Sequence, residues 1–238
     1  MADTILDRQQ WLDQVVEEII EPELPIIDPH HHLWKDRPGI PDSAYLIEAL
    51  HRDTNSGHNI VKTVFVECGA EYRTEGKERY KPLGETEFVA DQIKQSEKRE
   101  GANIAGIVGR ADLRLGDDVV EVLNQHLELG QGYFKGIRHA GAHALHPEAL
   151  TIPAGAPKDL FKDAGFRRGV KILGKMDMSY DSWHYHYQNG EFAELAKACP
   201  DTTMVLDHFG TPLGVGPYAS QKKEIFKQWK EDIKKIAD

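Results

Sequence analysis

Short apolar segments alternate with amphipathic segments along most of this 238-residue sequence. The apolar segments predict strands within 26–34 and at 61–68, 104–108, 133–138, 178–187 and 203–206. The amphipathic segments predict helices at about 87–97, 117–129, 166–173, 191–197 and 221–236. Near-continuous apolar runs are typical of strands that are buried on both faces of a parallel sheet. The sequence therefore predicts an α/β fold with about six strand–helix units.

Polar residues gather where the predicted strands end: His30 and His32, Glu67, Arg110, Arg138 and His139, His184 and His186, and Asp207 and His208. A TIM-like (β/α)8 barrel builds its active site at these carboxyl ends. A doubly wound sheet does so too, but usually with a glycine-rich phosphate turn after its first strand. Histidines stand there instead, which favours the barrel. We expect a single domain over 1–238, with an amphipathic helix over 7–20 at its N-terminus.

A closed barrel of this type needs eight strand–helix units, and the sequence supplies about six. Two interpretations stay open: a fragment of a longer enzyme, or a truncated relative. In the second case the first and sixth strands would be open edges, which promote association or aggregation. We would then expect weakened metal binding and negligible activity from the chain alone.

The composition limits the partners and the location of the protein. A formal net charge of -10 argues against binding to nucleic acid or to an anionic membrane surface. The sequence contains no apolar run that could span a bilayer and does not begin like a signal peptide. Its two cysteines fit a reducing compartment. We therefore expect a cytoplasmic protein that acts on a small molecule, with homo-oligomerisation left open.

The segment Ile26 to Trp34 reads IIDPHHHLW and contains the strongest functional signal in the sequence. In an extended segment alternate residues share a face, so His30 and His32 point one way and His31 points the other. Asp28 shares the face of His30. Two imidazoles so placed form a pair that can bind a divalent metal. The alternative is a loop with three solvated histidines.

Several motifs together resemble the amidohydrolase-2 family of metal-dependent TIM-barrel hydrolases. They are IDPHHHLW, VFVECGAEY, GIVGRADL, FKGIRHA, WHYHYQ and VLDHFGTPLGVGPY, in this order. The resemblance extends from Ile26 to Asp238 and is closest to the lactonase-like branch. It implies a divalent metal, usually zinc, bound by His30, His32 and a fifth-strand histidine that maps onto His186. It also maps a sixth-strand histidine onto His208. The family's essential aspartate after strand eight has no counterpart in this sequence.

Each candidate residue also has a structural interpretation. His186 is a metal ligand or a packed strand histidine. His208 is an acid–base group for the substrate carbonyl or a strand cap. Arg138 clamps a substrate carboxylate or forms an internal ion pair with Glu67, and Arg110 has the same two alternatives. His139 and Trp34 are placed in the substrate site, although an aromatic residue just after a strand is more often core.

The sequence and the resemblance together predict a metal-dependent hydrolase that opens a lactone or cyclic ester of a small carboxylic or sugar acid. In this scheme metal-bound hydroxide attacks the carbonyl of a carboxylate-bearing lactone. Two alternatives remain. One is a non-oxidative decarboxylase that uses the same site, and the other is a catalytically inactive fragment.

Overall fold

The computed structural model describes residues 10–11, 13–37, 43–150, 152 and 154–237. This part of the chain contains a six-stranded parallel sheet with the strand order β1-β2-β3-β4-β5-β6. The strands are β1 (Ile26–His31), β2 (Ile60–Val66), β3 (Asn103–Gly109), β4 (Phe134–Arg138), β5 (Ser179–Ser182) and β6 (Met204–Leu206). A doubly wound sheet reverses its strand order at a switch point, whereas this order never reverses. The predicted α/β class and the incomplete barrel are confirmed.

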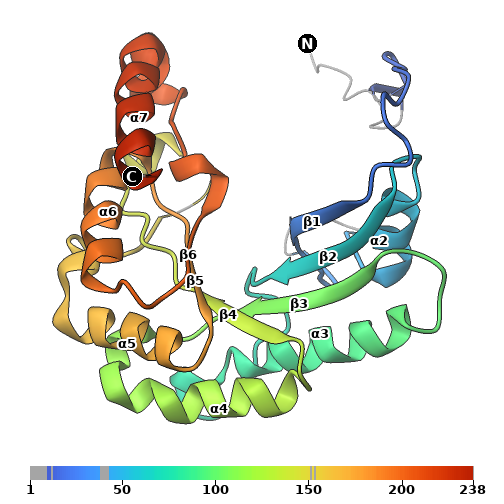
Figure 1. The fold of residues 1–238 in the computed structure, drawn as a ribbon, viewed down its shortest axis with the longest axis horizontal. Helices are drawn as coiled ribbons and strands as arrows, with labels where there is room; N and C mark the ends of the chain where they lie inside the picture. Colours follow the sequence, from blue (N-terminus) through green and yellow to red (C-terminus); the bar gives the residue numbers. More distant parts are fainter. Residues whose placement is uncertain (1–9, 12, 38–42, 151, 153, 238) are drawn as a thin grey trace.

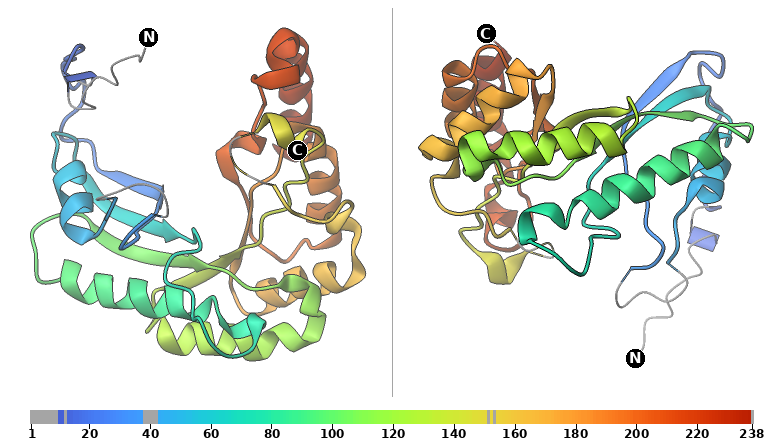
Figure 2. Two further views of the ribbon diagram at one scale, coloured as in Figure 1. Left: turned by 180° about the vertical axis from the view of Figure 1, so that it is seen from behind. Right: turned by 90° about the horizontal axis from the view of Figure 1, so that it is seen from below.

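Helices follow the strands and cover the outer side of the curled sheet (Figure 1). They are α2 (Ile47–Thr54), α3 (Leu83–Ser96), α4 (Val119–Leu129), α5 (Ala164–Lys175), α6 (Asn189–Ala198) and α7 (Lys222–Ala237). Helix α3 contacts β3 and α4, α5 contacts β5, and α7 lies against α6. Seen from behind, α3 and α4 lie beneath the strands, and seen from below they lie in front of them (Figure 2). In the described chain no helix is both long and apolar enough to cross a membrane.

The core lies between the sheet and these helices. Phe65, Ile107 and Tyr180 from the strands are fully buried, as are Phe166 and Val170 of α5. Burying a large apolar side chain contributes about 1.5–3 kcal/mol, so this layer is the main source of stability. Phe65 and Ile107 come from the largely apolar strands β2 and β3, whereas Tyr180 comes from the mostly polar β5.

The predicted N-terminal helix over 7–20 is wrong where the structure describes it. Residues 10–11 are helical, but 13–20 are turn and irregular chain, and residues 7–9 and 12 lie outside the described residues. Val15, Val16 and Ile20 are 71%, 90% and 92% exposed. An amphipathic helix depends on a surface that covers its apolar face, and these residues have none.

Two further predictions differ from the structure. The strand expected at 178–187 ends at Ser182, and His186–Gln188 form a short 3-10 helix, η5. Helix α2 was not predicted, because its sequence IEALHRDT is short and mostly polar. The other predicted strands and helices agree with the structure to within a few residues.

Candidate functional site

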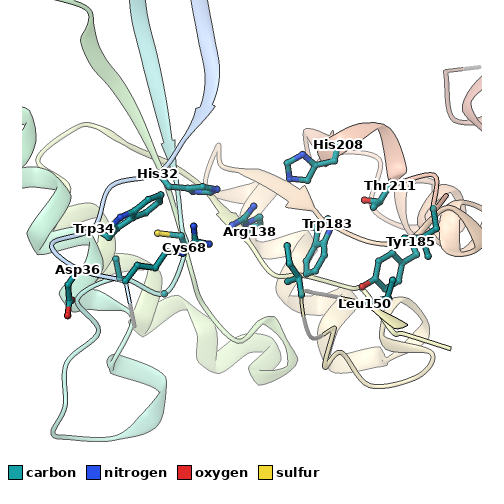
Figure 3. A pocket seen from close by; sticks show the side chains of 15 residues that line it. His32, Trp34, Asp36, Cys68, Arg138, Leu150, Trp183, Tyr185, His208 and Thr211 are labelled. Atoms are coloured by element: carbon teal, nitrogen blue, oxygen red, sulfur yellow. The ribbon is translucent and has the colours of Figure 1, made fainter. Parts of the chain in front are cut away.

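A cavity of about 660 Å³ lies at the carboxyl ends of the strands. Its wall includes His32 and Trp34 after β1, Arg138 at the end of β4, Trp183 after β5 and His208 after β6. Figure 3 shows Arg138 between the His32–Trp34 side and the Trp183–His208 side. The parallel sheet thus brings His32 and His208, which are 176 positions apart in the sequence, to one cavity.

The histidine run alternates as the extended chain requires. The rings of His30 and His32 are neighbours, with centroids 4.9 Å apart. His31 faces the other way, where its Nε2 lies 3.0 Å from the hydroxyl of Thr63. The carboxylate of Asp28 accepts a hydrogen bond from the backbone N–H of His30 at 3.1 Å, so it braces the strand end. Two of the three histidines therefore face the site and one belongs to the core.

The backbone orients the ring of His32. Its Nδ1 lies 2.7 Å from the carbonyl oxygen of Val66, which can only accept, so Nδ1 carries the proton and donates. Burial lowers the pKa of His32, and the imidazole is therefore neutral near pH 7. The lone pair is then on Nε2. A ring held in one tautomer by a carbonyl is the arrangement of many metal-binding and general-base histidines.

The guanidinium of Arg138 connects both sides of the site. Its Nε donates to Oε1 of Glu67 at 2.9 Å, and its Nη2 donates to the backbone carbonyl of Glu67. Its Nη1 lies 3.6 Å from Oδ2 of Asp207 and 3.3 Å from Nε2 of His30. The internal ion pair with Glu67, one of the two alternatives for Arg138, is therefore present. The same side chain also lines the cavity.

His30 is held between Arg138 and Asp207. Because a guanidinium can only donate, the lone pair of His30 is on Nε2 and its proton is on Nδ1. That Nδ1 lies 3.8 Å from Oδ1 of Asp207. Burial, and then the positive charge of Arg138, lowers the pKa of His30 to about 3. Burial raises the pKa of Asp207. The neutral imidazole thus links the arginine and the aspartate.

Asp181 of β5 is a buried carboxyl that the sequence did not reveal. It pairs in register with Arg138 of β4 and is only 5% exposed. Its Oδ1 accepts a hydrogen bond from the hydroxyl of Ser179 at 2.8 Å. Burial, and then the negative charge of Asp207, raises the pKa of Asp181 to about 7. Asp181 is thus the second aspartate, after Asp207, that lies close enough to Arg138 to interact with its charge.

His208 stands on a tight turn after β6. It belongs to the short 3-10 helix η6 (Asp207–Gly210), in which His208 and Phe209 have positive φ angles of 50° and 54°. Such left-handed conformations cost about 1–2 kcal/mol per residue, so surrounding contacts must hold them. The ring of His208 lies 4.9 Å from that of His30, centroid to centroid. The predicted sixth-strand histidine is thus beside the first-strand pair.

His186, the predicted third metal ligand, lies elsewhere. It begins η5, and its ring packs edge-on against Tyr187 and Tyr218. Its Nδ1 accepts the backbone N–H of Leu213 at 3.3 Å. It is not among the described residues that line the cavity. These contacts are those of a packed histidine, and a ligand role for His186 stays a prediction.

His139 and Arg110 are likewise not among the described cavity-lining residues. His139 is 3% exposed, accepts the backbone N–H of Leu113 at 3.2 Å and packs edge-on against Phe166. Arg110 donates to the carbonyl of Ala111 at 3.2 Å. Both side chains follow strands as predicted, but they serve local packing and hydrogen bonding in this arrangement.

The cavity also has aromatic walls that sequence reasoning missed in part. Trp34 was predicted there and lines it, while Trp183 and Tyr185 were not predicted. They were missed because the sequence predicted that the fifth strand continues to residue 187. The strand ends at Ser182, so Trp183 and Tyr185 follow its carboxyl end, where the cavity lies.

The donors at this site do not form a ready metal centre. The described residues contain no group of three or more His, Cys, Asp or Glu side chains that could hold a metal ion. The chemistry of His32 suits a metal, but the lone pair of His30 already accepts from Arg138. Three histidine lone pairs therefore do not converge on one point.

One curated protein and several solved structures are similar to this chain over most of its length. No protein-family model matches it. It is 29% identical over 233 residues to the uncharacterized protein y4mH of Sinorhizobium fredii, a match that covers 90% of this chain and 70% of that protein. An amidohydrolase from Burkholderia multivorans, solved with bound zinc, superposes with a TM-score of 0.64 at 21% identity. The same amidohydrolase with bound HEPES gives 0.63 at 22% identity.

These matches cover 89% of this chain in each of the two Burkholderia structures. The chain spans only 65% and 66% of the length of those structures. The protein therefore has the fold of the amidohydrolases of known structure, as a partial TIM-like barrel.

Proposed function

We propose that the protein is a hydrolase of the amidohydrolase-2 family that opens a lactone or similar cyclic ester of a small carboxylic or sugar acid. The observation that carries the proposal is the meeting of His30, His32, Arg138 and His208 at the carboxyl ends of the strands. A cavity of about 660 Å³ suits a small molecule. The ordered motifs from Ile26 onward support the family assignment.

Ester hydrolysis needs a group that binds the carbonyl or a carboxylate and a group that moves a proton. Arg138 places a positive charge on the cavity wall, and we assign it the binding of a carboxylate or carbonyl oxygen of the substrate. In the metal-free protein the neutral His32 presents an acceptor at Nε2 that can take a proton from water. With a metal bound, the same lone pair would be its ligand, and His208 would be the remaining acid–base group. His208 is assigned the second acid–base role.

A divalent metal, with zinc as the first choice, is proposed as the cofactor. The free donor of His32 and the zinc bound to the Burkholderia amidohydrolase support it. A bound metal would supply Lewis acidity at the ester carbonyl. Holding it would require Arg138 to leave His30, because their contact occupies the His30 lone pair.

The test is a substrate panel with separate arms for the two reactions. Five- and six-membered lactones of sugar acids and of unsaturated dicarboxylic acids are followed by acid release, and aromatic and acyclic carboxylic acids by carbon dioxide release. Each arm is run with added zinc and with chelator, for wild type and for His32→Asn. Ring opening that His32→Asn lacks supports the proposal. Carbon dioxide release would favour the decarboxylase, and no turnover on any lactone above the His32→Asn level would overturn it.

A further inference from the structure

Glu85, in the first turn of α3, has a buried carboxyl group that the proposed chemistry does not use. The residue is 1% exposed. Its Oε1 accepts two hydrogen bonds, from the backbone N–H of Cys68 at 2.9 Å and of Ala70 at 2.8 Å. Its Oε2 is buried without a hydrogen-bond partner among the described atoms. A single side chain therefore holds two amides of one segment, 68–70.

The segment 68–70 is part of the cavity wall. Cys68, Gly69 and Ala70 all line the cavity. The chain there belongs to neither a strand nor a helix, and it turns through Gly69 with φ +80° and Glu71 with φ +53°. Backbone N–H groups outside regular structure need other partners when they are buried. Glu85 supplies such a partner at both ends of the segment.

Burial and a neighbouring negative charge favour the neutral form of the Glu85 carboxyl group. Burial, and then the negative charge of Glu67, raises the pKa of Glu85 to about 8. Near pH 7 the carboxyl is thus mostly protonated, with its carbonyl oxygen available to both amides. A neutral carboxyl avoids the large desolvation cost of a buried charge beside Glu67.

We propose that Glu85 is a positioning residue that fixes the segment 68–70, and with it one wall of the substrate cavity. The link to the substrate rests on the proposed function, whereas the clamp on the backbone does not. Loss of the clamp should loosen the wall locally. Substrate binding should then weaken more than turnover of bound substrate, because Glu85 contacts the wall and not the reacting groups.

Cys68 is a natural reporter of this wall. The sequence contains two cysteines, and the other, Cys199, is 1% exposed. Cys68 is an exposed residue of this wall, and desolvation of its thiol, and then the negative charge of the neighbouring Glu85, raises the thiol pKa to about 12. Only the thiolate is alkylated, so the thiol should react slowly with iodoacetamide while the wall is closed. If the wall loosens, its pKa returns toward the ordinary value and alkylation accelerates.

The experiment compares Glu85→Ala, Glu85→Gln and Gln92→Ala at pH 7, with alkylation at Cys68 followed by peptide mass spectrometry. Gln92 is the matched control because it is also buried on α3 and accepts one backbone N–H, that of Ile47, away from the cavity. We expect Glu85→Ala to be alkylated at least about tenfold faster than wild type, since the thiolate fraction sets the rate. Glu85→Gln keeps the acceptor oxygen but removes the charge that helps to raise the Cys68 pKa, so it controls for that direct effect and should be alkylated clearly more slowly than Glu85→Ala. Gln92→Ala should stay near the wild-type rate.

Equal rates for Glu85→Ala and wild type would overturn the clamp, and so would equal acceleration in Gln92→Ala or Glu85→Gln. If Glu85→Ala does not fold, hydrogen exchange of wild type decides, because rapid exchange of the Cys68 and Ala70 amides is incompatible with the clamp. With a substrate from the lactone panel, Glu85→Ala should raise KM with little change in kcat, and Glu85→Gln should restore KM. Accelerated alkylation without any lactone turnover would leave the clamp standing and reject the proposed function.

Discussion

The indole Nε1 of Trp229 donates a hydrogen bond to the backbone carbonyl of Phe209 at 2.6 Å. It joins helix α7 to the left-handed turn that carries His208. Because this turn is unfavourable by itself, contacts from outside must hold it in place. The last described helix thus contributes to the geometry of the candidate site without lining it.

Replacing Trp229 with Phe should disturb this turn. Phe keeps an aromatic ring and removes the N–H donor, so we expect a loss of about 1 kcal/mol in unfolding free energy. The rate of hydrolysis should fall by more than this small loss of stability would cause, because His208 loses its fixed position. Urea unfolding and steady-state kinetics measure the two effects. Trp11→Phe, at a residue that is 62% exposed, is the control and should change neither.

Arg138→Met should destabilise the protein strongly. It leaves the carboxylates of Glu67 and Asp207 without their cation, and breaking a buried pair in this way costs about 3 kcal/mol. Arg114→Met is the matched control, since its ion pair with Asp112 is much more exposed and should contribute less than about 1 kcal/mol. Urea unfolding near pH 7 measures both. Similar losses would contradict a structural role for the Arg138 pair.

The same Arg138→Met variant should bind zinc more tightly than wild type. The substitution frees the lone pair of His30 and removes a positive charge beside two carboxylates. Competition with a fluorescent zinc chelator would measure the affinity without reference to turnover. An unchanged affinity would show that Arg138 does not compete with a metal for His30.

His32→Asn and His184→Asn should separate chemistry from core structure. His32 presents Nε2 at the cavity, so its loss should reduce hydrolysis by about a hundredfold or more. His184 is fully buried between the hydroxyl of Ser182 and the side-chain oxygen of Asn189. Its replacement should cost stability and leave kcat of the folded fraction nearly intact. The reverse pattern would mean that the two histidines have been assigned the wrong roles.

Acid should destabilise the protein through its buried histidines. His126 is fully buried, with Nδ1 2.8 Å from the hydroxyl of Thr86 and Nε2 3.1 Å from the carbonyl of Arg110. Burial lowers its pKa to about 4, whereas an unfolded histidine titrates near 6.5. Between these values the unfolded state binds more protons, so stability falls as the pH drops from about 6.5 to 4.

His126→Gln should reduce this loss by up to about 3 kcal/mol, since the difference of about 2.5 pKa units corresponds to that free energy. Thermal or urea unfolding in a pH series measures it, with the exposed His58→Gln as control. A parallel pH dependence in His126→Gln and wild type would mean that His126 is not buried in its neutral form.

Much of the fold followed from periodicity. The strands β3 and β4 are buried along most of their length, which leaves a near-continuous apolar run in the sequence, whereas β6 is only partly buried and its Val205 is 38% exposed. The helix expected at 7–20 has the correct periodicity, but Val16 contacts no core and is 90% exposed. Periodicity shows what a segment could bury. It does not show whether another surface lies there to cover it.

The site could be predicted where strand geometry alone decides the direction of a side chain. Alternation placed His30 and His32 together, and the parallel sheet brought His208 to them. Arg138 was left with two alternatives because its partner, Glu67, is 71 residues away. Glu85 was not predicted for the same reason. A glutamate in the first turn of a helix is common in sequences, and only the folded chain places the amides of Cys68 and Ala70 against it.

The candidate site joins the two end strands of the described sheet. β1 and β6 stand at opposite ends of the strand order, yet His30 of β1 lies within 3.8 Å of Asp207, the first residue after β6. The gap between these two groups is thus fixed by how sharply the whole sheet bends. A slight flattening anywhere along it, even at β3, would pull the site open. A ligand that contacts both groups would hold the two end strands together, and its affinity would therefore depend in part on how easily the sheet bends.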